Sequence, residues 1–220
     1  MNLIIVIKER SWSQVEELFR KVELHGDSKV LPYKRAKIES RVMEFNEVKP
    51  LSLYVLKQKI DFQEKLREQF LKQRKIDTLD LNGKRGGLVF RLKGEKKEWK
   101  MVPPIVEISK IDGGVPVLLD GQHRFLLAKK LGLPIRVVWI EKVLEDVPVI
   151  AKPVEWTRVK KLTKVPEVVE KRDFRYKRLK DFPDISRFSK VKITEKNRRY
   201  FFYRDLNEIT SSAVRRFCEN

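Results

Sequence analysis

Cysteine and histidine are nearly absent from this chain. Cys218 is the only cysteine among 220 residues, so the chain can form neither an internal disulfide nor a Cys-rich zinc site. His25 and His123 are the only histidines, which is too few for a histidine-based metal centre. The sequence therefore excludes the common zinc sites, while carboxylates could still hold Mg²⁺.

Long apolar runs are also missing. No run approaches the roughly 20 residues that cross a bilayer as a helix, and the apolar stretch at residues 1–7 is too short for a signal peptide. We therefore expect a cytoplasmic protein with no membrane partner. Hydrophobic residues still make up 41% of the chain, enough for the core of one ordinary domain with a substantial appendage.

A P-loop is absent as well. Residues 82–87, NGKRGG, are the most glycine-dense stretch but lack the GxxxxGKS or GxxxxGKT order and a strand-to-helix context. We interpret them as a plain hairpin turn before a strand at Leu88–Leu92, with a flexible phosphate-contacting loop as the alternative.

Basic residues, by contrast, are abundant. The chain has 50 Lys and Arg against 31 Asp and Glu, a net charge of +19, and residues 151–220 alone hold 20 against 10. Such a surplus attracts polyanions and is typical of nucleic-acid binding. A heat-adapted surface, as in a thermophile, is the alternative, but it explains many charges of both signs better than a surplus of one.

The stretch Val115–Ile140 predicts a strand, a tight polar turn, a helix and a second strand. Val117 begins a short apolar run suited to a buried strand, and Gly121 permits a sharp turn or a close approach to a ligand. Gly132 stands where a C-terminal helix cap is expected, and Pro134 prevents the helix from continuing. The apolar residues at helical spacing between them are Phe125, Leu126, Ala128 and Leu131.

Gln122, His123 and Arg124 fall in the first turn of this predicted helix. Unpaired backbone N–H groups and the helix dipole attract anions there. Because the dipole disfavours a cation at this end, an Arg beside a His suggests that a phosphate is expected between them. In the alternative interpretation Asp120 is only an N-cap, His123 packs on the sheet and Arg124 makes a surface ion pair.

The DGQHR sequence of residues 120–124, with the preceding PIVE at residues 104–107, resembles the ParB/sulfiredoxin superfamily. Its nearest forms are the DGQHR box of DndB-like proteins from DNA modification systems and the DGHHR box of archaeal free-serine kinases. The resemblance implies an α+β fold with a small mixed sheet and packed helices. It also implies that Gly121, Gln122, His123 and Arg124 hold nucleotide phosphates, ATP or ADP being the expected nucleotide, with Mg²⁺ at Asp120.

Two departures limit what the resemblance implies. A sulfiredoxin-like reductase would have a cysteine in the box, where this chain has Gln122. The serine kinases have glutamates in an early segment where this chain has the basic sequence PYKR at residues 32–35. A kinase would therefore need Glu39 or Glu107 on the acceptor side, and we name Asp120, His123 and Glu39 as the candidate catalytic residues.

The rest of the chain divides into a core at 1–145, with a helical insertion near 51–75, and a basic extension at 146–220. In the core we expect a strand at Leu3–Ile7, a capping box of Ser13 and Glu16 starting a helix, and a second helix at Ala36–Phe45. Residues 112–114 predict a hairpin that joins two core strands. The helix at Leu51–Arg74 is expected to be broken near Asp61.

The extension predicts a basic hairpin at residues 190–204 and a last helix at 207–217. Arginines alternate with aromatic residues in its second strand, a combination that offers phosphate contacts and stacking faces for nucleic acid. Packing of the aromatics on the core is the alternative. The candidate nucleic-acid contacts are Arg198, Arg199, Tyr200 and Arg204.

Three hypotheses follow from these patterns. The first is a ParB-like nucleotide-binding protein, hydrolysing a nucleoside triphosphate and acting on or beside DNA. The second is a small-molecule kinase resembling the free-serine kinases. The third is a non-catalytic DNA-binding protein. The sequence leaves the oligomeric state open.

Overall fold

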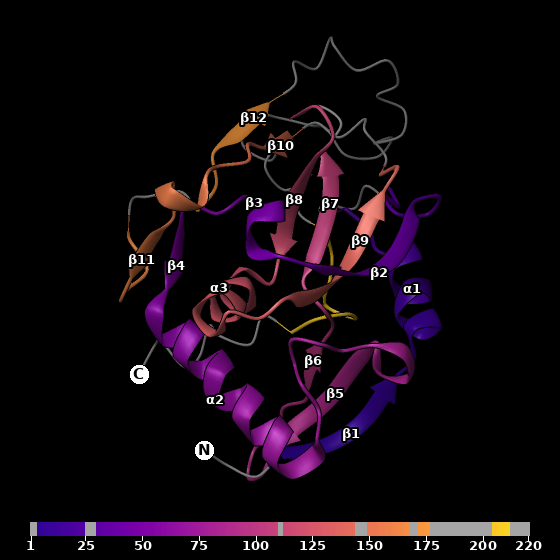
Figure 1. Cartoon of the computed structure of the whole chain (residues 1–220). Helices are drawn as coiled ribbons and strands as arrows, with labels where there is room; N and C mark the ends of the chain where they lie inside the picture. The colour runs from indigo at the N-terminus through magenta and orange to yellow at the C-terminus, as the bar shows by residue number, and fades with distance from the viewer. Residues whose placement is uncertain are drawn as a thin grey trace.

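The computed structural model describes residues 4–24, 30–109, 112–143, 149–167, 171–176 and 204–211, which contain three α-helices, a larger sheet of five strands, a smaller sheet of three strands and two two-stranded sheets (Figure 1). None of these helices is long and apolar enough to cross a membrane. The elements are β1 (Ile4–Arg10), α1 (Trp12–Arg20), β2 (Lys37–Met43), η1 (Phe45–Glu47), β3 (Lys49–Pro50), β4 (Tyr54–Leu56), α2 (Lys57–Arg74), η2 (Gly83–Arg85), β5 (Gly87–Leu92), β6 (Trp99–Met101), β7 (Ile105–Ser109), β8 (Val115–Asp120), α3 (Gln122–Leu131), β9 (Ile135–Glu141), β10 (Val149–Ala151), η4 (Trp156–Arg158), β11 (Lys160–Leu162) and β12 (Phe174–Tyr176).

The larger sheet has five strands in the order β2-β9-β7-β8-β3. β7 and β8 form an antiparallel hairpin around residues 112–114, as predicted, while β7 and β9 are parallel. β3 adds to β8 in parallel, and β2 pairs with β9 in the antiparallel direction. The sheet is therefore mixed, and the predicted α+β fold is confirmed.

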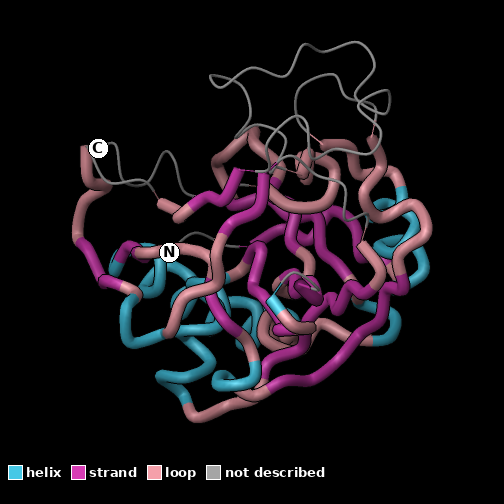
Figure 2. The backbone as a smooth tube through the Cα atoms, turned by 90° about the horizontal axis from the view of Figure 1, so that it is seen from above, coloured by secondary structure: helices cyan, strands magenta, loops and turns pink. Residues whose placement is uncertain are grey.

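Helices cover both faces of this sheet, because alternate residues of each strand point to opposite sides. Val117 and Leu119 of β8 pack in one apolar cluster with Val15 and Phe19 of α1. Leu118, between them, packs on the other face with the apolar residues of α3. Figure 2 shows helical segments to either side of the strands.

The smaller sheet, β1-β5-β6, forms a second core with α2. Leu66 and Phe70 of the helix are buried against its strands. α2 begins at Lys57, not at Leu51 as predicted, because residues 54–56 form β4. It continues through Asp61 for 18 residues, so the predicted break does not occur. The glycine-dense residues 82–87 form the short helical turn η2 and the start of β5, not a two-stranded hairpin.

The predicted helix at Ala36–Phe45 is wrong, because most of this segment is β2. Seven residues of β2 pair one to one with β9, from Lys37 with Glu141 to Met43 with Ile135. The short charged segment has no strong helical pattern, and pairing with a neighbouring strand decides its conformation. The capping box of α1 is also shifted: Ser11 and Gln14 form it, not Ser13 and Glu16.

The C-terminal extension packs back on the core where the structure describes it. β11 pairs with β4, β10 pairs with β12, and Ile209 lies in the α1-side core. Ser211 exchanges two hydrogen bonds with the backbone of Lys100 in β6, each of 2.9 Å. Residues 207–209 form a turn where the last helix was expected to begin; most of the predicted basic hairpin and residues 212–217 lie outside the described residues.

Candidate functional site

The DGQHR box occupies the junction that its sequence predicted. β8 ends at Asp120, Gly121 is the N-cap with a left-handed φ of 92°, and α3 begins at Gln122. A Cβ atom on residue 121 would lie 2.5 Å from the Cβ of Pro104, closer than real contacts allow. Both the backbone angle and this contact require glycine at the turn.

All five box residues line a cavity of about 280 Å³. Its remaining walls come from distant segments of the chain: α2, β5, β6, residues 171–172 and residues 210–211. The DGQHR box therefore forms one wall of the cavity, and α2 and the C-terminal residues 210–211 supply others.

The cavity carries a strong excess of positive charge. Arg124, Lys59, Lys100, Lys171 and Arg172 line it. Asp120 is the one carboxylate among the described lining residues. In addition, the backbone N–H groups of Gln122 and His123 have no acceptor among the described residues, as is usual for the first turn of a helix. These features together favour an anion.

The side chains of the box bind neighbouring backbone. Gln122 donates from Nε2 to the carbonyl of Ser52, 3.2 Å away, and the buried Arg124 donates from Nη1 to the carbonyl of Val102. That is the only side-chain hydrogen bond of Arg124 within the described residues, so its guanidinium keeps further donors beside the cavity. Gln122 and Arg124 thus line the cavity and also bind the backbone of neighbouring segments.

His123 is a neutral acceptor in this arrangement. Its Nε2 lies 3.4 Å from the backbone N of Leu56, which donates to it. Burial, and then the charges of Lys171, Lys59 and Arg124, lowers the pKa of His123 to about 3. At neutral pH the imidazole therefore carries its proton on Nδ1 and cannot serve as a general acid in the cationic form.

Lys171 and Arg172 are cavity residues that the sequence did not single out. A backbone hydrogen bond holds this segment beside the cavity: the carbonyl of Lys171 accepts from the N–H of Leu53 at 2.8 Å. Desolvation of the ammonium group, and then Arg172, lowers the pKa of Lys171 to about 8, while Asp120 opposes the shift, although Lys171 as a whole is an exposed residue and the desolvation is therefore partial. The ammonium is therefore still largely charged at pH 7. In sequence they are two of 50 Lys and Arg, and no local pattern marks them.

Asp120 is placed to assist a metal ion but not to hold one alone. No group of three or more His, Cys, Asp and Glu that could bind a metal occurs among the described residues. Mg²⁺ in phosphate sites commonly uses only one or two carboxylates together with substrate phosphates and water. One carboxylate beside a helix N-terminus, an end of a helix that favours anions, fits that kind of site.

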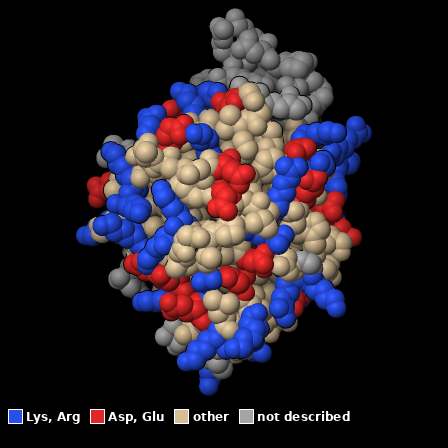
Figure 3. All heavy atoms as spheres, in the orientation of Figure 1, with Lys and Arg blue, Asp and Glu red and all other residues tan. Residues whose placement is uncertain are grey.

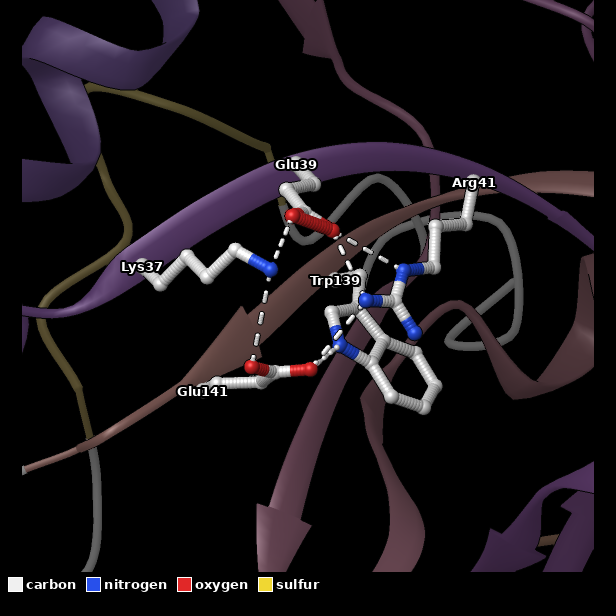
Figure 4. A network of polar contacts seen from close by, with 5 residues as sticks. All are labelled: Lys37, Glu39, Arg41, Trp139 and Glu141. Atoms are coloured by element: carbon white, nitrogen blue, oxygen red, sulfur yellow. Dashed lines mark hydrogen bonds and ion pairs between the residues drawn. The ribbon is translucent and has the colours of Figure 1, made fainter.

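Glu39 lies away from the cavity, in a network on β2 and β9 (Figure 4). Arg41 bridges Glu39 at 2.8 Å and Glu141 at 3.1 Å, and its guanidinium lies 4.1 Å from the centre of the Trp139 ring. Hydrogen bonds from Lys37 and then Arg41 lower the pKa of Glu39. The structure therefore does not bring Glu39 together with Asp120 and His123, and its cationic neighbours disfavour a role as a base.

Glu107, the other acceptor-side candidate, is buried in an ion pair with Arg204. The Nη2 atom of Arg204 lies 3.0 Å from Oε2 of Glu107, and the side chains are 5% and 10% exposed. Tyr33 also donates its hydroxyl proton to Glu107. Arg204 is therefore a structural residue and offers no exposed guanidinium to nucleic acid, contrary to the prediction. Arg198, Arg199 and Tyr200 lie outside the described residues.

Comparison with known proteins identifies the family of the chain. No curated protein and no solved structure matches it. The family model of the ParB CE domain matches residues 14–160, which include the box, α2 and all five strands of the larger sheet. The chain therefore belongs to the ParB CE domain family.

Proposed function

We propose that the cavity at the DGQHR box binds a nucleoside triphosphate or diphosphate, and that the protein hydrolyses the triphosphate while acting on or beside DNA. The observation that carries this proposal is that five cationic side chains line the same cavity as the first turn of α3, although one of them, Lys100, is also paired with Glu208 at 2.9 Å. A phosphate chain carries several negative charges close together, and a helix N-terminus with added Lys and Arg suits it.

In this proposal the backbone N–H groups of Gln122 and His123 hold one phosphate at the helix N-terminus. Lys59, Lys171 and Arg172 neutralise the others, and Arg124 contributes its remaining donors. Asp120 would be the residue beside a bound Mg²⁺, which would stabilise negative charge on the phosphate oxygens. Asp120 would orient a water of that ion or the attacking water, because it is the one carboxylate among the described lining residues.

The kinase alternative has less support. It needs a carboxylate beside the phosphoryl acceptor, and the two candidates for that role, Glu39 and Glu107, are engaged in ion pairs elsewhere. Only Asp120 could serve on the described cavity wall, and it would then be unavailable to the metal.

A role at DNA is supported by charge. The net charge of +19 far exceeds what a phosphate pocket needs, and Lys and Arg side chains surround much of the molecular face in Figure 3, with Asp and Glu among them. The same surface charge would also suit a non-catalytic DNA-binding protein. The two hypotheses therefore differ in whether the cavity binds a nucleotide.

Calorimetric titration with ATP, ADP, CTP and GTP in the presence of Mg²⁺ tests the proposal. We expect micromolar binding of at least one nucleotide. Replacing Lys59 and Lys171 by Gln should weaken binding at least about tenfold for each lost charge-assisted contact. Lys72→Gln is the matched control, because Lys72 is exposed on the same helix and lies outside the cavity lining.

Absence of binding by all four nucleotides would refute the proposal and leave the non-catalytic DNA-binding alternative. If binding is found, release of phosphate from the triphosphate, measured with and without added DNA, separates hydrolysis from simple binding.

A further inference from the structure

Four exposed cations lie on and beside β11, and none of them lines the cavity: Arg158, Lys160, Lys161 and Lys164. We call this group the β11 basic surface. The sequence has no Asp or Glu from residue 156 to residue 166. None of the four cations forms an ion pair within the part of the chain that the structure describes. In Figure 3, Lys and Arg side chains gather at the left, on the side where Figure 1 draws β11.

Two other groups of cations have a structural explanation that the β11 basic surface lacks. The cations in Figure 4 are paired with the carboxylates of the same network. Lys72, Arg74 and Lys75 lie at the C-terminal end of α2, where the helix dipole favours positive charge. A β-strand has no comparable dipole. Neither ion pairing nor a helix end therefore accounts for the charge around β11.

The backbone that carries these cations is fixed on the core. Trp156 of η4 packs on Phe45, with ring centres 4.3 Å apart, and its Nε1 donates to the carbonyl of Val48 at 2.7 Å. β11 pairs with β4, and the backbone N–H of Lys160 donates to the carbonyl of Leu53 at 2.9 Å. A backbone that is already ordered lowers the entropy cost of binding a partner.

The composition of the surface favours the phosphate backbone of duplex DNA as the partner. Binding of single strands uses aromatic side chains that stack on bases, and membrane surfaces take up helices with a broad apolar face. Trp156 is the one aromatic residue from 156 to 167, and it packs on the core. Val165 is the one exposed large apolar side chain in that range. Cations without stacking or inserting groups suit phosphates, whose contacts carry no base information.

The surface is also joined to the DGQHR box by direct contacts. The backbone N–H of Leu56, at the end of β4, donates to Nε2 of His123 at 3.4 Å. The rings of Trp156 and of Phe125 in α3 are stacked, with their centres 6.3 Å apart. DNA on the β11 basic surface would therefore lie on a segment that contacts the proposed nucleotide site.

We propose that the β11 basic surface binds the phosphate backbone of duplex DNA without reading its base sequence. The inference rests on the proposed action at DNA and names the surface that performs it. Each Lys or Arg that neutralises one phosphate adds about 0.9 to the steepness with which log affinity falls against log salt concentration. The number of contacts can therefore be measured.

The test replaces Lys160, Lys161 and Lys164 together by Gln and measures binding to labelled duplexes of two unrelated sequences by fluorescence anisotropy. At about 100 mM salt we expect affinity to fall at least about tenfold, and the salt slope to become shallower by about 2–3, because three phosphate contacts are lost. Both duplexes should be affected alike. The variant should keep the wild-type melting temperature and nucleotide affinity, since these side chains are exposed and lie outside the cavity lining.

The matched control replaces Lys72, Arg74 and Lys75 by Gln. These side chains are also exposed, so the control removes the same number of positive charges from another part of the surface. It should weaken DNA binding by about threefold or less, because only screened long-range attraction is lost, and should leave the salt slope unchanged.

The negative results are distinguishable. If the two triple variants weaken DNA binding by the same factor and with the same slope, the β11 basic surface is refuted while action at DNA stands. If the wild type binds no duplex at about 50 mM salt, the proposed action at DNA is refuted, and this surface with it. Tighter binding to vesicles of phosphatidylserine and phosphatidylcholine than to duplex DNA, lost in the β11 variant, would assign the surface to a membrane and overturn the proposal.

Discussion

At the scale of single residues, Gly121 is the position on which the box depends. It takes a left-handed φ of 92° and lies against the ring of Pro104. The residues after it bind backbone carbonyls and line the cavity at the same time. A change at this turn would therefore alter both the stability of the fold and the position of the N–H groups that face an anion.

We predict that Gly121→Ala destabilises the protein by at least about 1 kcal/mol more than Gly132→Ala. Both positions have positive φ, where a side chain costs roughly 1–2 kcal/mol. Only residue 121 adds a steric conflict, since a Cβ at Gly132 would meet nothing within 4 Å. Urea denaturation measures the difference. Nucleotide binding should be lost only in the first variant, and equal losses of stability would contradict the role assigned to Pro104.

At the scale of elements, a buried ion pair fastens the C-terminal segment to the sheet. Arg204 contacts Glu107 of β7 and the hydroxyl of Tyr33, and its backbone forms an isolated bridge with Leu24. The segment that follows reaches β6 and the cavity wall. The extension is therefore joined to the core by specific contacts.

We predict that Arg204→Met lowers the free energy of unfolding by about 3–5 kcal/mol, because the carboxylate of Glu107 would stay buried without its cation. Adding Glu107→Gln should restore part of the loss, since the amide carries no charge and still accepts from Tyr33. Denaturant unfolding of both single variants and the double variant measures this coupling.

The exposed pair of Lys49 and Glu155 is the control for that series. Its two atoms are 2.6 Å apart, but Glu155 is 62% exposed. Lys49→Met should change stability by less than about 1 kcal/mol. An Arg204→Met variant that loses no more than this control would show that the buried pair is not important for stability.

At the scale of the whole molecule, the surplus of positive charge exceeds the needs of the cavity. Five cations line the pocket, whereas the net charge is +19. Long-range attraction between such a protein and a polyanion weakens as salt screens it.

We predict that affinity for duplex DNA falls by a factor of about 10³ or more between 50 and 200 mM salt, as expected for six or more phosphate contacts. Fluorescence anisotropy with labelled DNA measures it. Nucleotide affinity over the same salt range is the control and should fall less, because fewer charges are paired. No detectable DNA binding at 50 mM salt would exclude the proposed action at DNA.

The sequence by itself determined the strand, turn and helix of the DGQHR box. Its signals are local: an apolar run, a glycine at the turn, helical spacing of apolar residues and a second glycine at Gly132, where the helix ends with a φ of 64°. The hairpin at residues 112–114 and the strand β9 were predicted for the same reason. Patterns of neighbouring residues suffice where local geometry decides the structure.

Tertiary structure alone decided other features. β2 is a strand because β9 pairs with it, whereas a helix was predicted for residues 36–45. Arg204 is buried because Glu107 and Tyr33 meet it across long sequence separations. The cavity cations Lys59 and Lys171 come from segments 112 residues apart in the numbering and look like any other lysines in sequence. The path of the chain brings these groups together, and no local pattern encodes that path.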